Sequence, residues 1–287
     1  MEIVREAKTM QKISESLKLQ GKIITLVPTM GALHKGHLKL MEEAKIAGDI
    51  LVISIFVNPT QFGPNEDYER YPHVLEKDKK LAEEVGVDYI FYPSAEEMYP
   101  ANFSTYVTVE EYSKKLCGKS RPTHFRGVTT IVTKLLNIIK PHKAFFGWKD
   151  AQQLIIIMKM VKDLNIDVEI IGVDTVREPD GLALSSRNEY LTKEERKQAL
   201  SIFSSLKGAK EIISNGVINA TIVKRRIVDE LNLMNLLKVD YIEIVDMETL
   251  NPVNEIKENT LIAIAAYVGK TRLIDNVIIR KEDLPQT

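Results

Sequence analysis

The chain has 287 residues, of which 44% are hydrophobic and 28% are charged, and its net charge at pH 7 is -1. These values are typical of a globular protein, and the length allows one large domain or two smaller ones. A net charge near zero provides no overall basic field for nucleic acid or for an anionic membrane. We therefore expect small-molecule partners, with no nucleic acid and no membrane among them.

The chain contains one cysteine, Cys117, which excludes an intrachain disulfide and a cysteine-rich zinc site and fits a reducing compartment. Residues 1–11 lack the apolar segment of a signal peptide. The longest apolar runs are too short to span a bilayer. We expect a cytoplasmic protein.

Buried strands are predicted in the first 175 residues by short apolar runs, and segments of helical periodicity separate them. The runs are residues 23–28, 50–57, 89–92, 144–146 and 168–173. Near-continuous apolar strands that alternate with helices are typical of a parallel sheet covered on both faces. Residues 1–175 are therefore predicted to form an α/β domain with a Rossmann-like, doubly wound parallel sheet that binds a nucleotide.

The pattern changes after Val176, where a polar segment contains the turn Pro179-Asp180-Gly181. Thr192 and Glu195 then have the spacing of a helix-capping box. Helices are predicted at 193–214 and 222–233, and strands at 241–245, 261–267 and 273–279. Residues 176–287 are predicted to form a smaller C-terminal α+β lid domain.

An H-x-G-H motif, His34 to His37, lies between the first long strand and the following helix. In a doubly wound sheet, ligands bind at the carboxyl ends of the strands. Gly31 and Gly36 allow the backbone to approach a phosphate, and a helix that starts near His37 directs its free N–H groups to the same place. The two imidazoles, three residues apart, project in similar directions and can stabilise the charge on a leaving pyrophosphate.

Two other interpretations of the histidine pair are available. The histidines could be ordinary loop residues, or they could bind a metal, although no third ligand lies near them in the sequence. Their position between a buried strand and an apolar-faced helix favours the nucleotide site.

Two further polar segments are candidates for the same site. Gly147 permits close backbone approach, Lys149 is a compact cation before a helix, and Gln153 lies one turn later. The hydroxyls and guanidinium of residues 184–188 suit a pyrophosphate, and such a loop can act as a lid. An ordinary capped helix and a solvated linker are the alternatives. Gln61, after the second long strand, could bind a small polar substrate.

Five segments, taken in order, resemble the pantothenate synthetases (pantoate–β-alanine ligases) of the HxGH nucleotidyltransferase-like superfamily. They read VPTMGALHKGH, FVNPTQFGPNEDYERYP, RPTHFRGV, FFGWKDAQQL and LSSRN, between about Leu26 and Leu191. The C-terminal third matches only in general character. The resemblance covers the predicted nucleotide domain and the start of the lid domain.

This resemblance implies a two-step reaction. The carboxylate of (R)-pantoate attacks the α-phosphate of ATP to give pantoyl adenylate and pyrophosphate, and the amine of β-alanine then displaces AMP. It also implies Mg2+, a homodimer, and a first domain that binds pantoate as well as ATP.

The same resemblance implies roles for individual residues. His37 is the expected proton donor, with His34 and Lys149 as further catalytic residues. Gln61 and Gln153 are expected to bind pantoate, and Gln61 also β-alanine. The expected ATP-binding residues are Met30, Gly31, Ala32, Leu33, His34, Lys35, Gly36, His37, Gly147, Trp148, Lys149, Asp150, Val176, Leu184, Ser185, Ser186 and Arg187.

The chain departs from the family pattern at three positions. Lys77 stands where a carboxylate is expected, so Asp78, with Glu76 as a second candidate, is the expected Mg2+ ligand. The metal could instead be bound mainly by ATP phosphates and water. Trp148 stands where Glu is common and Thr123 where Gly is common, which leaves the local geometry open.

Three rival functions remain open at this point. Another H-x-G-H nucleotidyltransferase would release a stable nucleotide-activated product. A tRNA-charging enzyme would need basic faces and an anticodon-binding part, which a chain of this charge and length lacks. A non-catalytic nucleotide sensor would have no use for Gln61 and Gln153.

Overall fold

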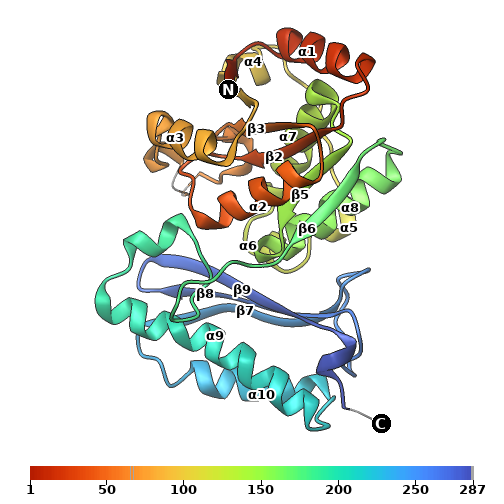
Figure 1. Ribbon diagram of the computed structural model, residues 1–287. Coiled ribbons are helices and arrows are strands. Elements are labelled where there is room, and N and C mark those ends of the chain that lie inside the picture. Colours follow the sequence, from red (N-terminus) through yellow and green to blue (C-terminus); the bar gives the residue numbers. More distant parts are fainter. Residues whose placement is uncertain (65, 67, 286–287) are drawn as a thin grey trace. The chain divides into compact units, whose positions relative to one another are not determined.

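The computed structural model describes residues 1–64, 66 and 68–285 (Figure 1). The chain divides into two compact units. The first contains residues 1–114, 118–148 and 152–174, and the second contains residues 115–117, 149–151 and 175–287. In the described part of the chain, no helix is both long and apolar enough to cross a membrane.

The first unit is built on a six-stranded parallel sheet with the strand order β1-β4-β3-β2-β5-β6. The order runs outward in both directions from the β2–β5 pair, which makes this pair the topological switch point, where ligands bind in such sheets. The strands are β1 (Glu2–Val4), β2 (Ile24–Thr29), β3 (Ile50–Ile55), β4 (Tyr89–Phe91), β5 (Lys143–Gly147) and β6 (Glu169–Val173).

Separate apolar clusters cover the two faces of this sheet, because successive strand residues point to opposite sides. Leu26 and Val52 belong to the cluster that contains buried residues of α1 (Ala7–Leu19), α7 (His124–Ile139) and α8 (Ala151–Asp163). Val27 and Leu51 belong to the cluster of α2 (Lys35–Ile46) and α3 (Leu75–Val85). The short helices are α4 (Ala95–Met98), α5 (Glu110–Ser113), α6 (Cys117–Ser120), η1 (Pro59–Gln61), η2 (Tyr68–Arg70) and η3 (Trp148–Asp150).

The second unit contains an antiparallel sheet of three strands, β7 (Leu237–Asp246), β8 (Thr260–Val268) and β9 (Thr271–Ile279). An apolar core lies between this sheet and the helices α9 (Lys193–Ser214) and α10 (Ala220–Leu231), which Figure 1 shows along one side of the strands. The two short helices are η4 (Ser186–Tyr190) and η5 (Lys281–Asp283). The predicted capping box of Thr192 and Glu195 is confirmed at the start of α9.

The predicted fold class, a doubly wound α/β sheet with a smaller α+β part, is confirmed. Besides the short helices, two elements were not predicted, the three-residue strand β1 and the helix α1. A strand of three residues is too short to show a period. Helix α1 has Met10, Ile13 and Leu17 at helical spacing, a pattern that the sequence prediction did not use.

Candidate active site

The H-x-G-H motif forms the first turn of α2, directly after β2. His34 is the N-cap residue, so the helix begins at Lys35 and not near His37 as predicted. The Nδ1 atom of His34 accepts a hydrogen bond from the Gly36 N–H (3.1 Å), and the Nδ1 atom of His37 accepts one from the His34 N–H (3.3 Å). The ring centroids are 4.1 Å apart. The two imidazoles therefore project together, as predicted.

These capping bonds determine what each imidazole can offer a ligand. A neutral imidazole carries one proton, and a nitrogen that accepts a hydrogen bond cannot also carry it. With both Nδ1 atoms accepting, the hydrogen-bond network assigns the proton of each ring to Nε2. The start of α2 thus presents two Nε2–H donors beside the positive end of a helix dipole.

Asp78 supports the loop that leads into this helix. Its Oδ2 accepts a hydrogen bond from the Ala32 N–H (2.9 Å) and its Oδ1 from the Leu33 N–H (2.8 Å). Asp78 is 1% exposed, and burial raises the pKa of its carboxyl although the two N–H bonds lower it. Gly31 and Ala32 both have left-handed backbone, with φ of 83° and 50°. This conformation directs successive N–H groups at one anion.

Gly31 and Gly36, which are predicted to let the backbone approach a phosphate, both lie close to protein side chains. A Cβ at Gly31 would lie 2.9 Å from Asp78 Oδ2, and a Cβ at Gly36 would lie 2.9 Å from Cε1 of the His34 ring. The space that each missing Cβ leaves is therefore filled by a protein side chain. Approach of a phosphate is not needed to explain either glycine.

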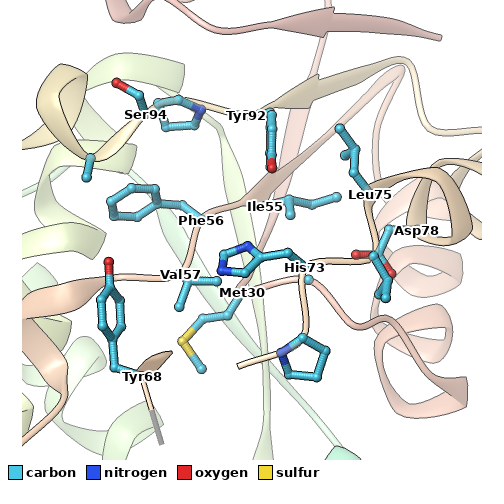
Figure 2. A pocket seen from close by; sticks show the side chains of 15 residues that line it. Met30, Ile55, Phe56, Val57, Tyr68, His73, Leu75, Asp78, Tyr92 and Ser94 are labelled. Carbon is cyan, nitrogen blue, oxygen red and sulfur yellow. The ribbon is translucent and has the colours of Figure 1, made fainter. Parts of the chain in front are cut away.

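A cavity of about 200 Å³ lies at the carboxyl ends of β2, β3 and β4 (Figure 2). Met30 and Asp78 line it, together with the polar side chains of His73, Tyr92 and Ser94. The sequence alone predicted no role for these last three residues. Their position follows from the parallel sheet, since strand ends that are distant in sequence meet at one edge.

Gln61 lies at the end of η1 and has an ordered carboxamide. Its Oε1 accepts a hydrogen bond from Asn58 Nδ2 (3.1 Å), and its Nε2 lies 2.9 Å from the sulfur of Met30. Asn58 is itself fixed, because its Oδ1 accepts hydrogen bonds from the hydroxyls of Tyr99 (2.8 Å) and Thr60 (2.9 Å). The Gln61 amide is thereby oriented with its Nε2 donor group toward Met30.

Asn58 was not predicted from the sequence to take part in the site. The Asn58-Pro59 pair indicates only the end of a strand. The residue is 1% exposed, and its Nδ2 also donates to the carbonyl of Gly127 (3.1 Å). A buried Asn whose amide is fully used is a feature of tertiary packing, and a single sequence gives no signal for it.

The RPTHFRGV segment supports the backbone of Gln61. The Gln61 carbonyl accepts hydrogen bonds from His124 Nδ1 (2.8 Å) and from Arg121 Nη2 (3.3 Å). Arg121 also forms an ion pair with Glu66. Burial raises the pKa of the Glu66 carboxyl, but the Arg121 guanidinium, the Gly63 N–H and the charge of His124 together outweigh it, so the pKa is lowered. This segment, which carried no predicted role, thus fixes the main chain of a predicted substrate-binding residue.

Three of the predicted site residues lie at the end of β5 or shortly after it. Gly147 is the last residue of β5 and Gln153 lies in the first turn of α8. The Gln153 side chain is half-buried and forms no hydrogen bond with any residue that the structure describes. The Trp148 indole covers Gly172 of β6, where an added Cβ would lie 2.5 Å from Nε1. Trp148 therefore packs against the sheet.

Lys149 belongs to the second unit, together with Asp150. Its main-chain carbonyl accepts a hydrogen bond from Asn276 Nδ2 (3.0 Å). Its ammonium forms no hydrogen bond or ion pair within residues 1–64, 66 and 68–285. The backbone of Lys149 is thus held by a hydrogen bond, and its ammonium has no partner among these residues.

The predicted phosphate loop is also in the second unit. Leu184 N–H donates to the Val176 carbonyl (3.0 Å), and Ser185 caps η4 by accepting a hydrogen bond from the Arg187 N–H (3.3 Å). Ser186 begins η4. Asn188, which is buried, donates to the carbonyl of Ala183 (3.0 Å). The predicted phosphate loop is therefore a hydrogen-bonded turn.

No group of three or more His, Cys, Asp or Glu side chains is arranged to bind a metal ion in the part of the chain that the structure describes. Asp78, the predicted Mg2+ ligand, is a carboxylate whose two oxygens already accept backbone hydrogen bonds. Its role toward a metal stays a prediction.

Comparison with known proteins gives one consistent result. The model of the Pantoate-beta-alanine ligase family matches residues 2–278. The chain belongs to the pantoate–β-alanine ligase family. Pantothenate synthetase from Thermotoga neapolitana is 56% identical over 279 residues, which cover 97% of this chain and 100% of the relative. The predicted resemblance is confirmed, and the match includes the C-terminal third, where the motifs alone had shown only general similarity.

Two solved structures resemble the chain over almost its whole length. Pantothenate synthetase from Thermus thermophilus is 41% identical, with a TM-score of 0.92, and covers 99% of this chain and 100% of its own. Pantoate-beta-alanine ligase from Francisella tularensis, complexed with beta-gamma ATP and beta-alanine, is 38% identical, with a TM-score of 0.79 and 97% coverage of each chain. The family relationship therefore extends to the whole fold.

Proposed function

We propose that the chain is an AMP-forming ligase that condenses (R)-pantoate with β-alanine to give pantothenate. The observation that carries this proposal is the family match over residues 2–278, joined to a helix start with two Nε2–H donors at the end of β2. The Francisella tularensis relative was solved with an ATP analogue and β-alanine, which supports the same substrates here.

The reaction proceeds in two displacements. A carboxylate oxygen of pantoate attacks the α-phosphorus of ATP, the bond to the β-phosphate bridging oxygen breaks, and pyrophosphate leaves. The nitrogen of β-alanine then attacks the carbonyl carbon of pantoyl adenylate, the acyl–oxygen bond breaks, and AMP leaves as the amine loses its proton. Because the pantoate carboxylate is ionised at pH 7, the enzyme needs no covalent nucleophile. Its task is alignment and stabilisation of charge.

His34 and His37 act as the donors to the ATP phosphates. Their Nε2–H groups stabilise the negative charge that grows as pyrophosphate leaves, and His37 is the proton donor. Lys149 contributes an ammonium that the described residues leave unpaired. Ser185, Ser186 and Arg187 also contact the phosphates.

The remaining predicted residues bind the rest of the substrates. Gln61 and Gln153 bind pantoate, and Gln61 also faces β-alanine, which agrees with an amide that is already oriented in the free chain. The residues proposed to contact the adenosine and the phosphates through their backbones or side chains are Met30, Gly31, Ala32, Leu33, Lys35, Gly36, Gly147, Trp148, Asp150, Val176 and Leu184.

Mg2+ enters with the ATP phosphates in this proposal. A small cation that keeps most of its water is commonly bound through substrate phosphates and few protein ligands, which agrees with the lone carboxylate of Asp78. The proposal also includes a homodimer, which the sequence resemblance implies, and a cytoplasmic location and small-molecule partners, as expected from the composition. Sedimentation of the purified chain tests the dimer.

Pantoate-dependent exchange of labelled pyrophosphate into ATP tests the first step, and AMP release on addition of β-alanine tests the second. We expect exchange only with pantoate, and AMP in equal amount to pantothenate. Exchange without pantoate, or none with it, contradicts the proposal. A stable nucleotide product that β-alanine does not consume would identify another H-x-G-H nucleotidyltransferase.

A further inference from the structure

Strand β9 carries two buried polar residues side by side, Asp275 and Asn276, which are 4% and 7% exposed. Neighbouring residues of a strand point to opposite faces of the sheet. Asp275 lies on the face whose other members, Leu273 and Ile279, belong to the core beneath α9 and α10. Asn276 therefore points to the opposite face.

Asn276 contacts the backbone of Lys149, 127 residues away in the sequence, by donating from Nδ2 to its carbonyl (3.0 Å). The Asn276 N–H in turn donates to Asp275 Oδ1 (2.8 Å). Since the Lys149 ammonium forms no bond within the described residues, its position depends on where its backbone is placed. The hydrogen bond from Asn276 helps to hold that backbone, together with the η3 turn to which Lys149 belongs.

On the other face, Asp275 contacts Arg177 in the segment that leads into the phosphate loop. Its two oxygens accept hydrogen bonds from Arg177, from Nη1 at 2.6 Å and from Nη2 at 2.9 Å. Arg177 Nη1 also donates to the Gly181 carbonyl (3.2 Å), and its guanidinium lies 4.1 Å from the centre of the Phe203 ring. Residues 176–184 form a closed turn above this ion pair, because Leu184 N–H bonds to the Val176 carbonyl.

We propose that Asp275 and Asn276 are positioning residues for the adenylation step, acting through the Ser185–Arg187 loop and through Lys149 respectively. This inference rests on the proposed function. Residues of the second unit would then position both Lys149 and the Ser185–Arg187 loop, which contact the same triphosphate. Neither residue needs to touch substrate for this role.

The physical basis is the sensitivity of catalysis to the placement of charged groups. A displacement of about 1 Å can lower a rate by about 10²-fold. A bidentate Arg–carboxylate pair and a buried amide–carbonyl bond both restrict such displacement on a rigid strand. Removal of either should lower the turnover number more than it raises the KM for pantoate.

Two double-mutant cycles test the proposal, with pantoate-dependent pyrophosphate exchange as the readout. We expect Asn276→Ala and the nearly isosteric Asn276→Asp to lower the exchange rate about tenfold in the wild-type background, and less than twofold in a Lys149→Ala background. In the second cycle, we expect Asp275→Asn to lower the exchange rate about tenfold in the wild-type background and less than twofold in an Arg187→Ala background. The KM for pantoate should stay within twofold of the wild-type value throughout.

A general loss of stability would give a different pattern. Asn219 caps α10 by accepting a hydrogen bond from the Ile222 N–H (3.1 Å), so Asn219→Ala weakens the same unit without touching β9. Thermal melting of each variant shows whether its structure is retained, and Asn219→Ala should exchange at the wild-type rate.

Two outcomes would overturn this inference but leave the proposed function intact. One is a wild-type exchange rate in Asn276→Ala, and the other is an equal fall in exchange rate with and without the Lys149 ammonium. A wild-type chain with no pantoate-dependent exchange would overturn the proposed function instead. The two failures are thus distinguishable in one set of measurements.

Discussion

The histidine pair at the start of α2 and Lys149 are fixed in place by contacts of different range. The His34–His37 arrangement is made within four residues, since each Nδ1 accepts a backbone N–H of the same helical turn. The backbone of Lys149 is held by a contact from Asn276, which follows it by 127 residues. A local arrangement is encoded in a short motif, whereas a long-range one exists only after the second unit has folded.

The largest expected effect comes from a change in the His34–His37 pair. His37→Ala removes one Nε2–H donor, and loss of such a donor typically costs about 3 kcal/mol, or 10²–10³ in rate. We expect a fall of that size in pyrophosphate exchange. His37→Asn separates the two functions of the ring, because its Oδ1 can replace Nδ1 as the acceptor of the His34 N–H.

The two His37 variants should therefore have the same rate but different melting temperatures. The Asn variant should melt close to the wild type, and the Ala variant below it. A His37→Asn chain that exchanges at nearly the wild-type rate would contradict the role given to Nε2.

The next largest effect concerns another long-range contact, the ion pair between Asp275 and Arg177. Asp275→Ala leaves the Arg177 guanidinium, a mostly buried group, without its carboxylate. Removal of one partner of a buried pair costs about 3 kcal/mol, because the other charge stays desolvated. Urea unfolding followed by circular dichroism should show that loss in the second unit.

A paired replacement tests whether the cost comes from the unpaired charge. Arg177→Met combined with Asp275→Leu removes both charges and should recover most of the unfolding free energy, but not the exchange rate. Recovery of both would mean that the ion pair has no part in placing the loop.

A third prediction concerns the support of the loop before α2. Asp78→Ala leaves the N–H groups of Ala32 and Leu33 without an acceptor, which should lower the free energy of unfolding by about 2 kcal/mol. Asp78→Asn should lose less, because its amide oxygen still accepts one of the two bonds.

The Mg2+ dependence of exchange separates this role from that of a metal ligand. If Asp78 acts by fixing the loop, the Mg2+ concentration for half-maximal exchange should be unchanged in Asp78→Asn. A large rise in that concentration, with normal stability, would identify Asp78 as a ligand.

The same difference in range explains how much the sequence could predict. The strands of the parallel sheet from β2 onward, both helices of the second unit and the Thr192 capping box follow from local periodicity and spacing, and all are present. Helix α1 carries a similar signal in Met10, Ile13 and Leu17, although it was not predicted. The start of α2 was predicted near His37 and lies two residues earlier, at Lys35, because His34 is the N-cap, a role that histidine seldom takes.

The site residues differ in the same way in whether the sequence could predict them. The histidine pair could be recognised because its geometry is contained in one turn. Asn58 and Asn276 could not, since each acquires its role from partners that lie far away in the sequence, Gly127 for one and Lys149 for the other. The same limit applies to Gly31, whose open side is occupied by Asp78.

The smallest expected effect uses a local contact in the second unit. Asn219→Ala removes the N-cap of α10, and loss of such a cap costs about 1 kcal/mol. Because this cap is a local contact outside β9 and the 176–190 segment, we expect a lower melting temperature with an unchanged exchange rate. If Asn219→Ala instead slowed exchange as much as Asn276→Ala, the rate would depend on the overall stability of this unit. The distinction between a locally organised histidine pair and a remotely placed Lys149 would then reduce to a difference in the stabilities of the two units.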